Sequence, residues 1–191
     1  MANKLEYEFK TMLTKKEYVD LMTHFTEHRG NLQINYYFDT DRFTLKATEI
    51  GLRVRKRENV NYEMTLKRKK GYVAHVINEF ITKEQFNEFC ETGIIPCESI
   101  RKDLEEIIKG QKIVNYMSLA TFRNSFPYKS GVLSIDKCKY VDKIDYELVF
   151  QSNVYETGKR EFVETVKSFG VQYKKAEPKM KRAYTALRRK L

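Results

Sequence analysis

Cysteine, proline and long apolar runs are scarce in this sequence of 191 residues. Its three cysteines (Cys90, Cys97 and Cys138) are odd in number and form no CxxC pair, which argues against a disulfide framework or a structural zinc site. No stretch approaches the roughly 18 uninterrupted apolar residues that a membrane-spanning helix needs. The opening segment MANKLEYEFK mixes charges with its apolar residues and lacks the apolar core of a signal peptide. We therefore expect a cytoplasmic protein without a membrane partner.

Signals that divide or repeat a chain are also missing. The sequence has 3 prolines and 8 glycines, and it contains no Pro/Gly-rich linker, internal repeat or low-complexity tract. Residues 1–191 are therefore predicted to form a single domain. The three histidines (His24, His28 and His75) have no serine or cysteine partner at a recognisable spacing, so a nucleophile constellation is not expected.

Positive charge is what the sequence has in excess. It contains 36 lysines and arginines against 26 aspartates and glutamates, which gives a formal net charge of +10. Such an excess indicates a polyanionic partner: nucleic acid, a phosphorylated metabolite or an anionic surface. Composition alone does not choose among these three classes.

Polar and apolar residues alternate with period two along most of the chain, and this pattern predicts eight strands. Their expected ranges are 4–13, 32–39, 50–58, 61–69, 73–81, 115–126, 131–140 and 143–151. Five helices are also expected. Two of them follow capping boxes at 14–17 and 82–85, and the other three span 99–109, 157–169 and 179–190.

Several of these strands carry charge on one face and apolar side chains on the other, because residues two apart share a face. The charged faces hold Glu6, Glu8 and Lys10 in the first strand, Arg53, Arg55 and Arg57 in the third, Lys67 and Lys69 in the fourth, and Asp145 and Glu147 in the eighth. A solvated face would explain any one of them. Like charges at adjacent same-face positions repel each other, so their clustering favours bound ions. We therefore predict an α+β fold in which an antiparallel β-barrel encloses the charged faces and helices cover the apolar outside.

The order of short motifs along the chain resembles the CYTH superfamily of triphosphate tunnel metalloenzymes. The N-terminal Glu6-x-Glu8-x-Lys10 matches the ExExK signature of that superfamily. The supporting elements, in chain order, are Tyr36-Tyr37-Phe38-Asp39-Thr40, Leu52-Arg53-Val54-Arg55, Thr65-Leu66-Lys67, Glu79, Arg123, Asp136, Asp145-Tyr146-Glu147 and Lys179-x-x-Arg182-Ala183. The match covers nearly the whole chain.

This resemblance implies an eight-stranded antiparallel tunnel with charged side chains in its lumen and helices packed outside. It also implies metal-dependent hydrolysis of a triphosphate-containing small molecule, with Mg²⁺ or Mn²⁺ as the cofactor. Members of the superfamily include thiamine triphosphatases, inorganic tripolyphosphatases and class IV adenylyl cyclases.

The resemblance also implies roles for individual residues. The metal ligands would be Glu6, Glu8, Asp145 and Glu147, with Glu79 and Asp136 as further candidates, because hard cations take oxygen ligands. The catalytic group would comprise Glu8, Lys10 and Asp145, the last of which would orient the attacking water or hold a second metal. The triphosphate would bind Arg53, Arg55, Lys67, Arg123 and Lys179. The remaining basic residues Arg57, Lys69, Lys181, Arg182 and Arg188-Arg189-Lys190 are expected to be solvated surface.

A structural salt-bridge lattice among the same charged residues is an alternative interpretation, and it is compatible with a metal site.

Two other functions also stay open. A class IV-type adenylyl cyclase would use the same phosphate contacts but attack with the ribose 3′-hydroxyl, and no recognisable adenine site favours this. A non-catalytic polyphosphate- or nucleotide-binding module would lack the full set of carboxylates. Nucleic acid is not expected as a partner, because the aromatic residues alternate as packing residues. Since no assigned residue is committed to a base or sugar, tripolyphosphate is expected to be favoured over nucleotide or thiamine triphosphates.

Overall fold

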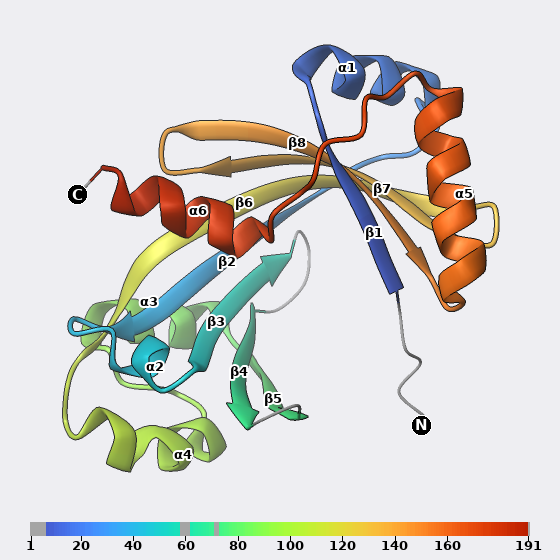
Figure 1. Cartoon of the computed structure of the whole chain (residues 1–191). Coiled ribbons are helices and arrows are strands. Elements are labelled where there is room, and N and C mark those ends of the chain that lie inside the picture. Colours follow the sequence, from blue (N-terminus) through green and yellow to red (C-terminus); the bar gives the residue numbers. More distant parts are fainter. Residues whose placement is uncertain (1–6, 58–61, 71–72, 191) are drawn as a thin grey trace. The chain divides into compact units, whose positions relative to one another are not determined.

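The computed structural model describes residues 7–57, 62–70 and 73–190 (Figure 1). Within these ranges the chain forms eight strands and six helices. The strands are β1 (Tyr7–Leu13), β2 (Asn31–Thr40), β3 (Ile50–Arg57), β4 (Tyr62–Lys70), β5 (Val73–Ile81), β6 (Ile113–Tyr128), β7 (Gly131–Tyr140) and β8 (Lys143–Ser152). The helices are α1 (Lys15–His24), α2 (Thr44–Ala47), α3 (Lys83–Thr92), α4 (Glu98–Ile108), α5 (Tyr155–Ser168) and α6 (Lys179–Arg188).

The strands form one eight-stranded antiparallel sheet in the order β1-β8-β7-β6-β2-β3-β4-β5. The predicted number of strands and their antiparallel arrangement are confirmed, while closure of the sheet into a barrel stays a prediction. The chain divides into two compact units. The first comprises Met1–Leu32 and Ala120–Leu191, and the second comprises Gln33–Leu119. The prediction of a single domain stays a prediction.

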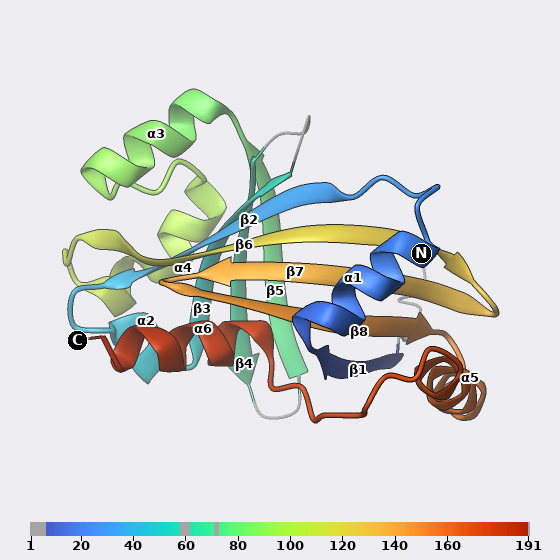
Figure 2. The same ribbon diagram turned by 90° about the horizontal axis from the view of Figure 1, so that it is seen from above.

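In the first unit, α1 and α5 cover the apolar face of β1, β7 and β8 (Figure 2). Leu148 and Phe150 of β8 are fully buried there, and Phe162 of α5 packs 6.1 Å from Phe9, measured between ring centroids. Helix α5 approaches the strands closely at Gly158, where a Cβ atom would lie 2.6 Å from the Cβ atom of Ser152. Burial of this alternating apolar set supplies the driving force that holds the helices on the strands.

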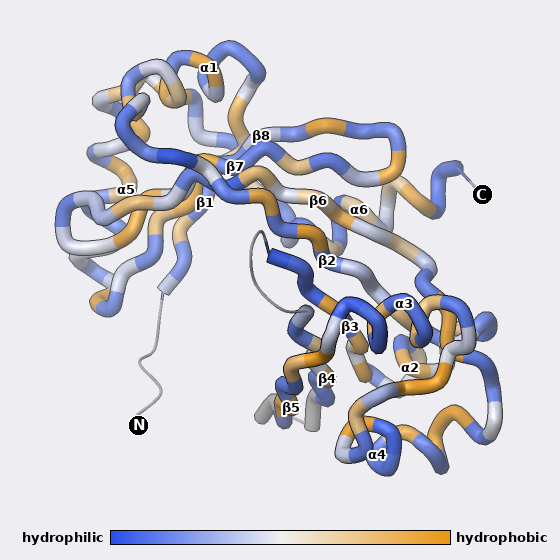
Figure 3. Tube along the Cα trace, turned by 180° about the vertical axis from the view of Figure 1, so that it is seen from behind, coloured by the Kyte–Doolittle hydropathy of each residue, from blue (hydrophilic) through white to orange (hydrophobic). Residues whose placement is uncertain are grey.

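In the second unit, the apolar face of β2, β3 and β4 packs against α3 and α4. Phe38 lies 4.4 Å from Phe89, and Tyr62 stacks 4.5 Å from Phe86, measured between ring centroids. Polar and apolar residues alternate along the strands of this unit, as the hydropathy colouring of Figure 3 shows. Leu52 and Val54 are buried, whereas Arg53 and Arg55 point to the opposite face, so the predicted alternation is confirmed there.

The strand and helix ranges read from the sequence agree with the structure within about three residues where the chain is described. Both capping boxes form: Glu17 and Gln85 reach back to the backbone of Thr14 and Thr82, as predicted. Helix α2 was not predicted. It has only four residues and no side-chain cap of its own, so its sequence carries almost no periodic signal. No helix in the described part of the chain is long and apolar enough to span a membrane.

Asp39 explains why α2 forms. Its side chain is 2% exposed, and its oxygens accept hydrogen bonds from the backbone N–H groups of Thr40, Leu45 and Lys46 at 2.7, 2.8 and 3.0 Å. A carboxylate at the start of a short helix satisfies donors that the helix itself leaves unpaired. Asp39, which belongs to one of the motifs in the sequence, therefore has a structural role.

We predict that Asp39→Ala lowers the free energy of unfolding by about 2–3 kcal/mol, because it leaves buried backbone donors without partners. Urea unfolding of the purified variants measures the change. Asp41→Ala is the matched control, since Asp41 is exposed on the same turn and should change stability by less than about 0.5 kcal/mol. Equal effects of the two substitutions would contradict the assigned role.

Candidate functional site

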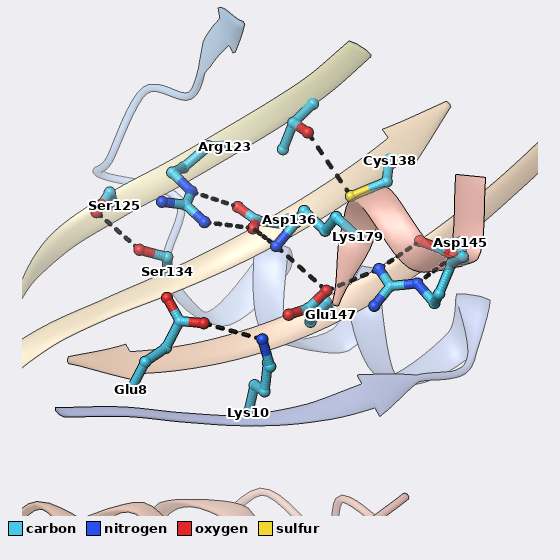
Figure 4. Close-up of polar contacts among 12 residues, drawn as sticks. Glu8, Lys10, Arg123, Ser125, Ser134, Asp136, Cys138, Asp145, Glu147 and Lys179 are labelled. Carbon is cyan, nitrogen blue, oxygen red and sulfur yellow. Dashed lines mark hydrogen bonds and ion pairs between the residues drawn. The ribbon is translucent and has the colours of Figure 1, made fainter. Parts of the chain in front are cut away.

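Charged side chains of the first unit gather on the face of β1, β6, β7 and β8 that lies opposite α1 and α5 (Figure 4). Register places Asp136 of β7 directly opposite Glu147 of β8, and Cys138 opposite Asp145. The predicted alternation of β1 is confirmed for its described part, where Tyr7 and Phe9 lie on the apolar face and Glu8 and Lys10 on the charged face. Glu6 and Leu5 lie outside the described residues.

Asp136 is the centre of the first part of this charged face. It is completely buried, and both of its oxygens accept hydrogen bonds from Arg123, at 2.8 Å from Nε and 2.7 Å from Nη2. Lys179, at the start of α6, lies 2.9 Å from the Oδ2 atom of Asp136 and 3.2 Å from the Oε2 atom of Glu147. Lys179 thereby joins two strand carboxylates.

Arg182, one helical turn after Lys179, makes the second link. Its Nη2 atom donates to Oε2 of Glu147 at 2.7 Å, and its Nε and Nη2 atoms donate to the two oxygens of Asp145 at 3.0 and 3.2 Å. The hydroxyl of Tyr140 also donates to Asp145. Asp145 and Glu147, which would repel each other as neighbours on one face, are thus bridged by a single guanidinium.

The pKa values follow from burial and from these contacts. Burial alone would raise the pKa of Asp136, but the hydrogen bond from Arg123 and the charge of Lys179 outweigh it and lower that pKa. Burial also lowers the pKa of Lys179, and the charges of Asp136 and Glu147 more than reverse this. Burial and the hydrogen bond to Asp145 raise the pKa of Tyr140 to about 12. Asp136 and Lys179 are therefore held in their charged forms at neutral pH, with Tyr140 protonated.

The structure corrects the interpretation of Arg182 as solvated surface. Its side chain is 11% exposed and contacts two carboxylates. The first turn of α6 meets the charged face through Lys179 and Arg182. Lys181 is 66% exposed and pairs with Glu177, as expected for a surface residue. The Lys179-x-x-Arg182 spacing was the available signal, because residues three apart share a helix face.

Glu8 and Lys10 form a separate ion pair at 3.0 Å, and their side chains are 41% and 26% exposed. With them, the ion pairs of the described charged face join four carboxylates (Glu8, Asp136, Asp145 and Glu147) and four cations (Lys10, Arg123, Lys179 and Arg182). The salt-bridge lattice considered from the sequence is therefore present.

The second unit has its own charged face, on β3 and β4, and its composition is different. Arg55 donates from Nε to Oδ1 of Asn35 at 3.0 Å, and Arg53 donates to the hydroxyl of Thr65 at 3.2 Å. The Nε atom of Arg53 is buried and has no hydrogen-bond partner among the described residues. Lys67 shares this face, because it lies opposite Gly51 in the register that places Thr65 opposite Arg53.

Positive charge is poorly compensated on this second face. Burial, together with the neighbouring charges of Arg53 and Arg57, lowers the pKa of Arg55 to about 10. Glu63 opposes this shift only in part, and its ion pair with Arg57 is long at 3.8 Å. Arg57 is 51% exposed, in agreement with the prediction of a surface position. A bound anion would relieve the repulsion among these arginines.

Glu79 is not brought to this charged face. It lies opposite Met64 in the β4–β5 register, on the face that packs against α3 and α4, and it accepts a hydrogen bond from Ser99 of α4 at 2.9 Å. The side chain of Lys69 lies outside the described residues.

The chemistry of Glu147 fits a hard cation. Its Oε2 atom is taken by Lys179 and Arg182, but its Oε1 atom is buried and has no hydrogen-bond partner among the described residues. Carboxylate oxygens are the ligands that Mg²⁺ and Mn²⁺ prefer. Within residues 7–57, 62–70 and 73–190, no three His, Cys, Asp or Glu side chains lie close enough together to hold a metal ion by themselves.

We predict that Arg182→Met lowers the free energy of unfolding by about 3 kcal/mol, because it leaves a buried carboxylate with fewer partners. Lys181→Met is the matched control: it removes one exposed ion pair and should cost less than about 1 kcal/mol. Urea unfolding measures both effects.

A double-mutant cycle separates the ion pair from general packing. Adding Glu147→Gln to Arg182→Met should cost less than the sum of the two single effects, because the two side chains interact directly. Strict additivity, or a loss from Lys181→Met as large as that from Arg182→Met, would contradict the assigned contact.

Several known proteins are similar to this chain in sequence or in fold. "Putative triphosphatase YjbK" from Bacillus subtilis (strain 168) is 29% identical over 196 residues, a span that covers 100% of both chains. The crystal structure of "a putative adenylate cyclase (bh2851)" from Bacillus halodurans is 27% identical, has a TM-score of 0.75 and covers 95% of this chain and 98% of that chain. A Hippeastrum protein, "putative adenylyl cyclase HpAC1", which reveals a dominant triphosphatase activity, has the same fold with a TM-score of 0.75 at 20% identity, over 95% of this chain and 96% of its own. The sequence pattern of the CYTH domain matches residues 4–184, nearly the whole length, and this chain therefore belongs to the CYTH domain family.

Proposed function

We propose that this protein is a metal-dependent hydrolase of triphosphate-containing small molecules that favours inorganic tripolyphosphate over nucleotide or thiamine triphosphates and acts in the cytoplasm. The observation that carries the proposal is the poorly compensated arginine face of the second unit, where Arg53 has a buried Nε atom without a hydrogen-bond partner among the described residues and where burial, with the charges of Arg53 and Arg57, lowers the pKa of Arg55 to about 10. The name of the Bacillus subtilis relative, a triphosphatase, supports the same class of reaction.

Phosphate binding is assigned first to Arg53, Arg55 and Lys67. The planar fork of an arginine can donate two hydrogen bonds to one phosphate group, and lysine adds a compact charge. Asn35 and Thr65 hold the two guanidinium groups in place through their side-chain oxygens. An arriving triphosphate would therefore meet donors that are already oriented.

Arg123 and Lys179 are also assigned to phosphate binding, and both contact strand carboxylates as well. Arg123 uses Nε and Nη2 for Asp136, so its Nη1 atom is assigned to the substrate. Lys179 has three N–H donors, and contacts with Asp136 and Glu147 account for two of them. Because both oxygens of Asp136 face cations, we assign Asp136 to positioning Arg123 and Lys179 and not to binding metal.

Metal binding is assigned to Glu147 and Glu8, together with Glu6, which lies outside the described residues. CYTH membership implies that a divalent metal is used, and the proposal names Mg²⁺ or Mn²⁺. When bound, such an ion would offset the negative charge of the phosphate oxygens and favour attack by water. Glu79 is left out of the assignment, because it lies on the opposite face of its strand.

Asp145 and Lys10 complete the proposed machinery. Asp145 is fixed by Arg182 and Tyr140, so its carboxylate can orient the attacking water without itself moving. Lys10 neutralises Glu8 and can exchange that partner for a phosphate oxygen.

We predict that Arg55→Met lowers kcat/KM for tripolyphosphate roughly 10- to 100-fold, the value of one or two charge-assisted hydrogen bonds. Stability should hold or rise in the same variant, because the substitution removes a cation that its neighbours repel. Arg57→Met is the matched control on the same strand, being half-exposed, and should lower kcat/KM less than threefold, as is usual for an exposed charge. Loss of stability in parallel with activity would mean that Arg55 is structural.

We predict that tripolyphosphate has a kcat/KM at least equal to that of ATP and of thiamine triphosphate, and that pyrophosphate is at least roughly tenfold poorer, because it offers fewer groups to the arginine face. Phosphate release is measured for the four compounds with Mg²⁺ and with Mn²⁺, and EDTA should abolish it. Cyclic AMP is assayed in the ATP reaction, since its formation would establish the cyclase instead. Binding without turnover of any compound would overturn the hydrolase proposal in favour of a binding module.

A further inference from the structure

A cavity of about 660 Å³ lies within the first unit, between β1, α5 and the segment that follows α5. We call it the α5 groove. Figure 2 shows this following segment running past β1 before α6 begins. Backbone contacts fix it there: the N–H group of Met12 donates to the carbonyl of Lys174 at 3.0 Å, and the N–H group of Lys174 donates to the hydroxyl of Thr11 at 2.8 Å. The groove is thus built by packed elements.

The wall and floor of the α5 groove are mainly apolar. Phe9 and Phe162 extend into it from the core of the first unit, and the ring of Tyr155 lies 5.5 Å from that of Phe9, measured between centroids. Tyr173 and Val163 also line the groove, and they are 62% and 43% exposed. Cavities of roughly 300–1,000 Å³ with apolar and aromatic walls are typical of small-molecule sites.

The polar part of the groove is almost entirely cationic. Four lysines and a single carboxylate line it, namely Lys10, Lys159, Lys167, Lys175 and Glu8. Lys159 and Lys167 stand eight residues apart on α5 with Val163 midway, so the three side chains follow one stripe of the helix. Neither lysine forms an ion pair with a carboxylate in the described part of the chain, and Lys159 lies over the ring of Tyr155 at 5.8 Å from its centroid.

We propose that the α5 groove binds an amphiphilic anion: a molecule with an apolar body and one carboxylate, sulfate or phosphate head. The apolar body would displace water from Phe9, Phe162, Val163 and Tyr173, and the head would pair with Lys159 and Lys167. Two of the lining residues, Glu8 and Lys10, also belong to the proposed hydrolase machinery. The variants below leave both of them unchanged and binding is measured without substrate, so the test does not depend on the proposed hydrolase activity.

Decanoate is the probe, used below the concentration at which it aggregates, and isothermal titration calorimetry on the full chain is the measurement. We expect saturable binding of one decanoate per chain. Decyltrimethylammonium, with the same chain and the opposite head charge, should bind at least roughly tenfold more weakly, because four lysines surround the site.

Two variants locate the site. Lys159→Glu combined with Lys167→Glu should weaken decanoate binding roughly tenfold or more, by replacing attraction with repulsion. Val163→Glu should weaken it as well, because it puts a charge into the apolar wall, and its exposed helical position tolerates the change. The matched control is Lys137→Glu combined with Lys139→Glu, two exposed lysines of β7 that do not line the groove, which should change binding less than threefold.

Circular dichroism of every variant establishes that the fold is retained. Three results would overturn the proposal: no saturable binding to the parent protein, equal binding of the cationic amphiphile, or an equal loss in the Lys137/Lys139 control. Binding that survives both Val163→Glu and the Lys159/Lys167 double substitution would likewise place the ligand elsewhere.

Discussion

A buried carboxylate determines how the first unit is put together. Glu147 is completely buried in the middle of β8, and an ionised group can stay there only if opposite charges meet it. Lys179 and Arg182 supply them from the first turn of α6. The same two cations extend to Asp136 and Asp145, so one helix turn ties together the charged faces of β7 and β8. The first turn of α6 is therefore held by ion pairs, with Ala183 and Ala186 buried farther along the helix, whereas α1 and α5 are held mainly by apolar packing.

The two units differ in how far the charges on their charged faces are compensated by opposite charges. In the first unit each described carboxylate of the charged face has a cationic partner, so most of its arginine and lysine donors already serve the protein. In the second unit Glu63 pairs with Arg57 at 3.8 Å and offsets the charge of Arg55 only in part, while Arg53 has no ion pair among the described residues. Repulsion that is kept in a folded protein lowers its stability, and a ligand of opposite charge recovers that free energy on binding. Clusters of cations with perturbed pKa values are frequent at the functional sites of enzymes.

Local patterns predicted most of the fold, and long-range contacts account for what they missed. Alternation such as Tyr146, Leu148 and Phe150 against Asp145 and Glu147 fixes both the strand and its faces, because the period of two is a property of the strand alone. Arg182 could not be assigned in this way. Its partners lie 35 and 37 positions earlier in the chain, and a basic helix near a terminus has the same sequence pattern whether it is solvated or docked. Helix α2 was missed for a related reason, since Asp39 caps it from outside the helix.

The described structure shows where part of the net charge of +10 lies. The lattice around Glu147 does not account for it, because the ion pairs of that face join equal numbers of carboxylates and cations. Part of the excess lies where lysines and arginines face apolar surface or one another: on the arginine face of β3 and on the lysine stripe of α5. Solubility alone requires only dispersed surface charge, so cations concentrated beside buried donors or an apolar cavity need a further cause. The two proposed ligands correspond to these two places. A chain of phosphates is proposed for the arginine face, and an apolar body with a single charged head is proposed for the α5 groove.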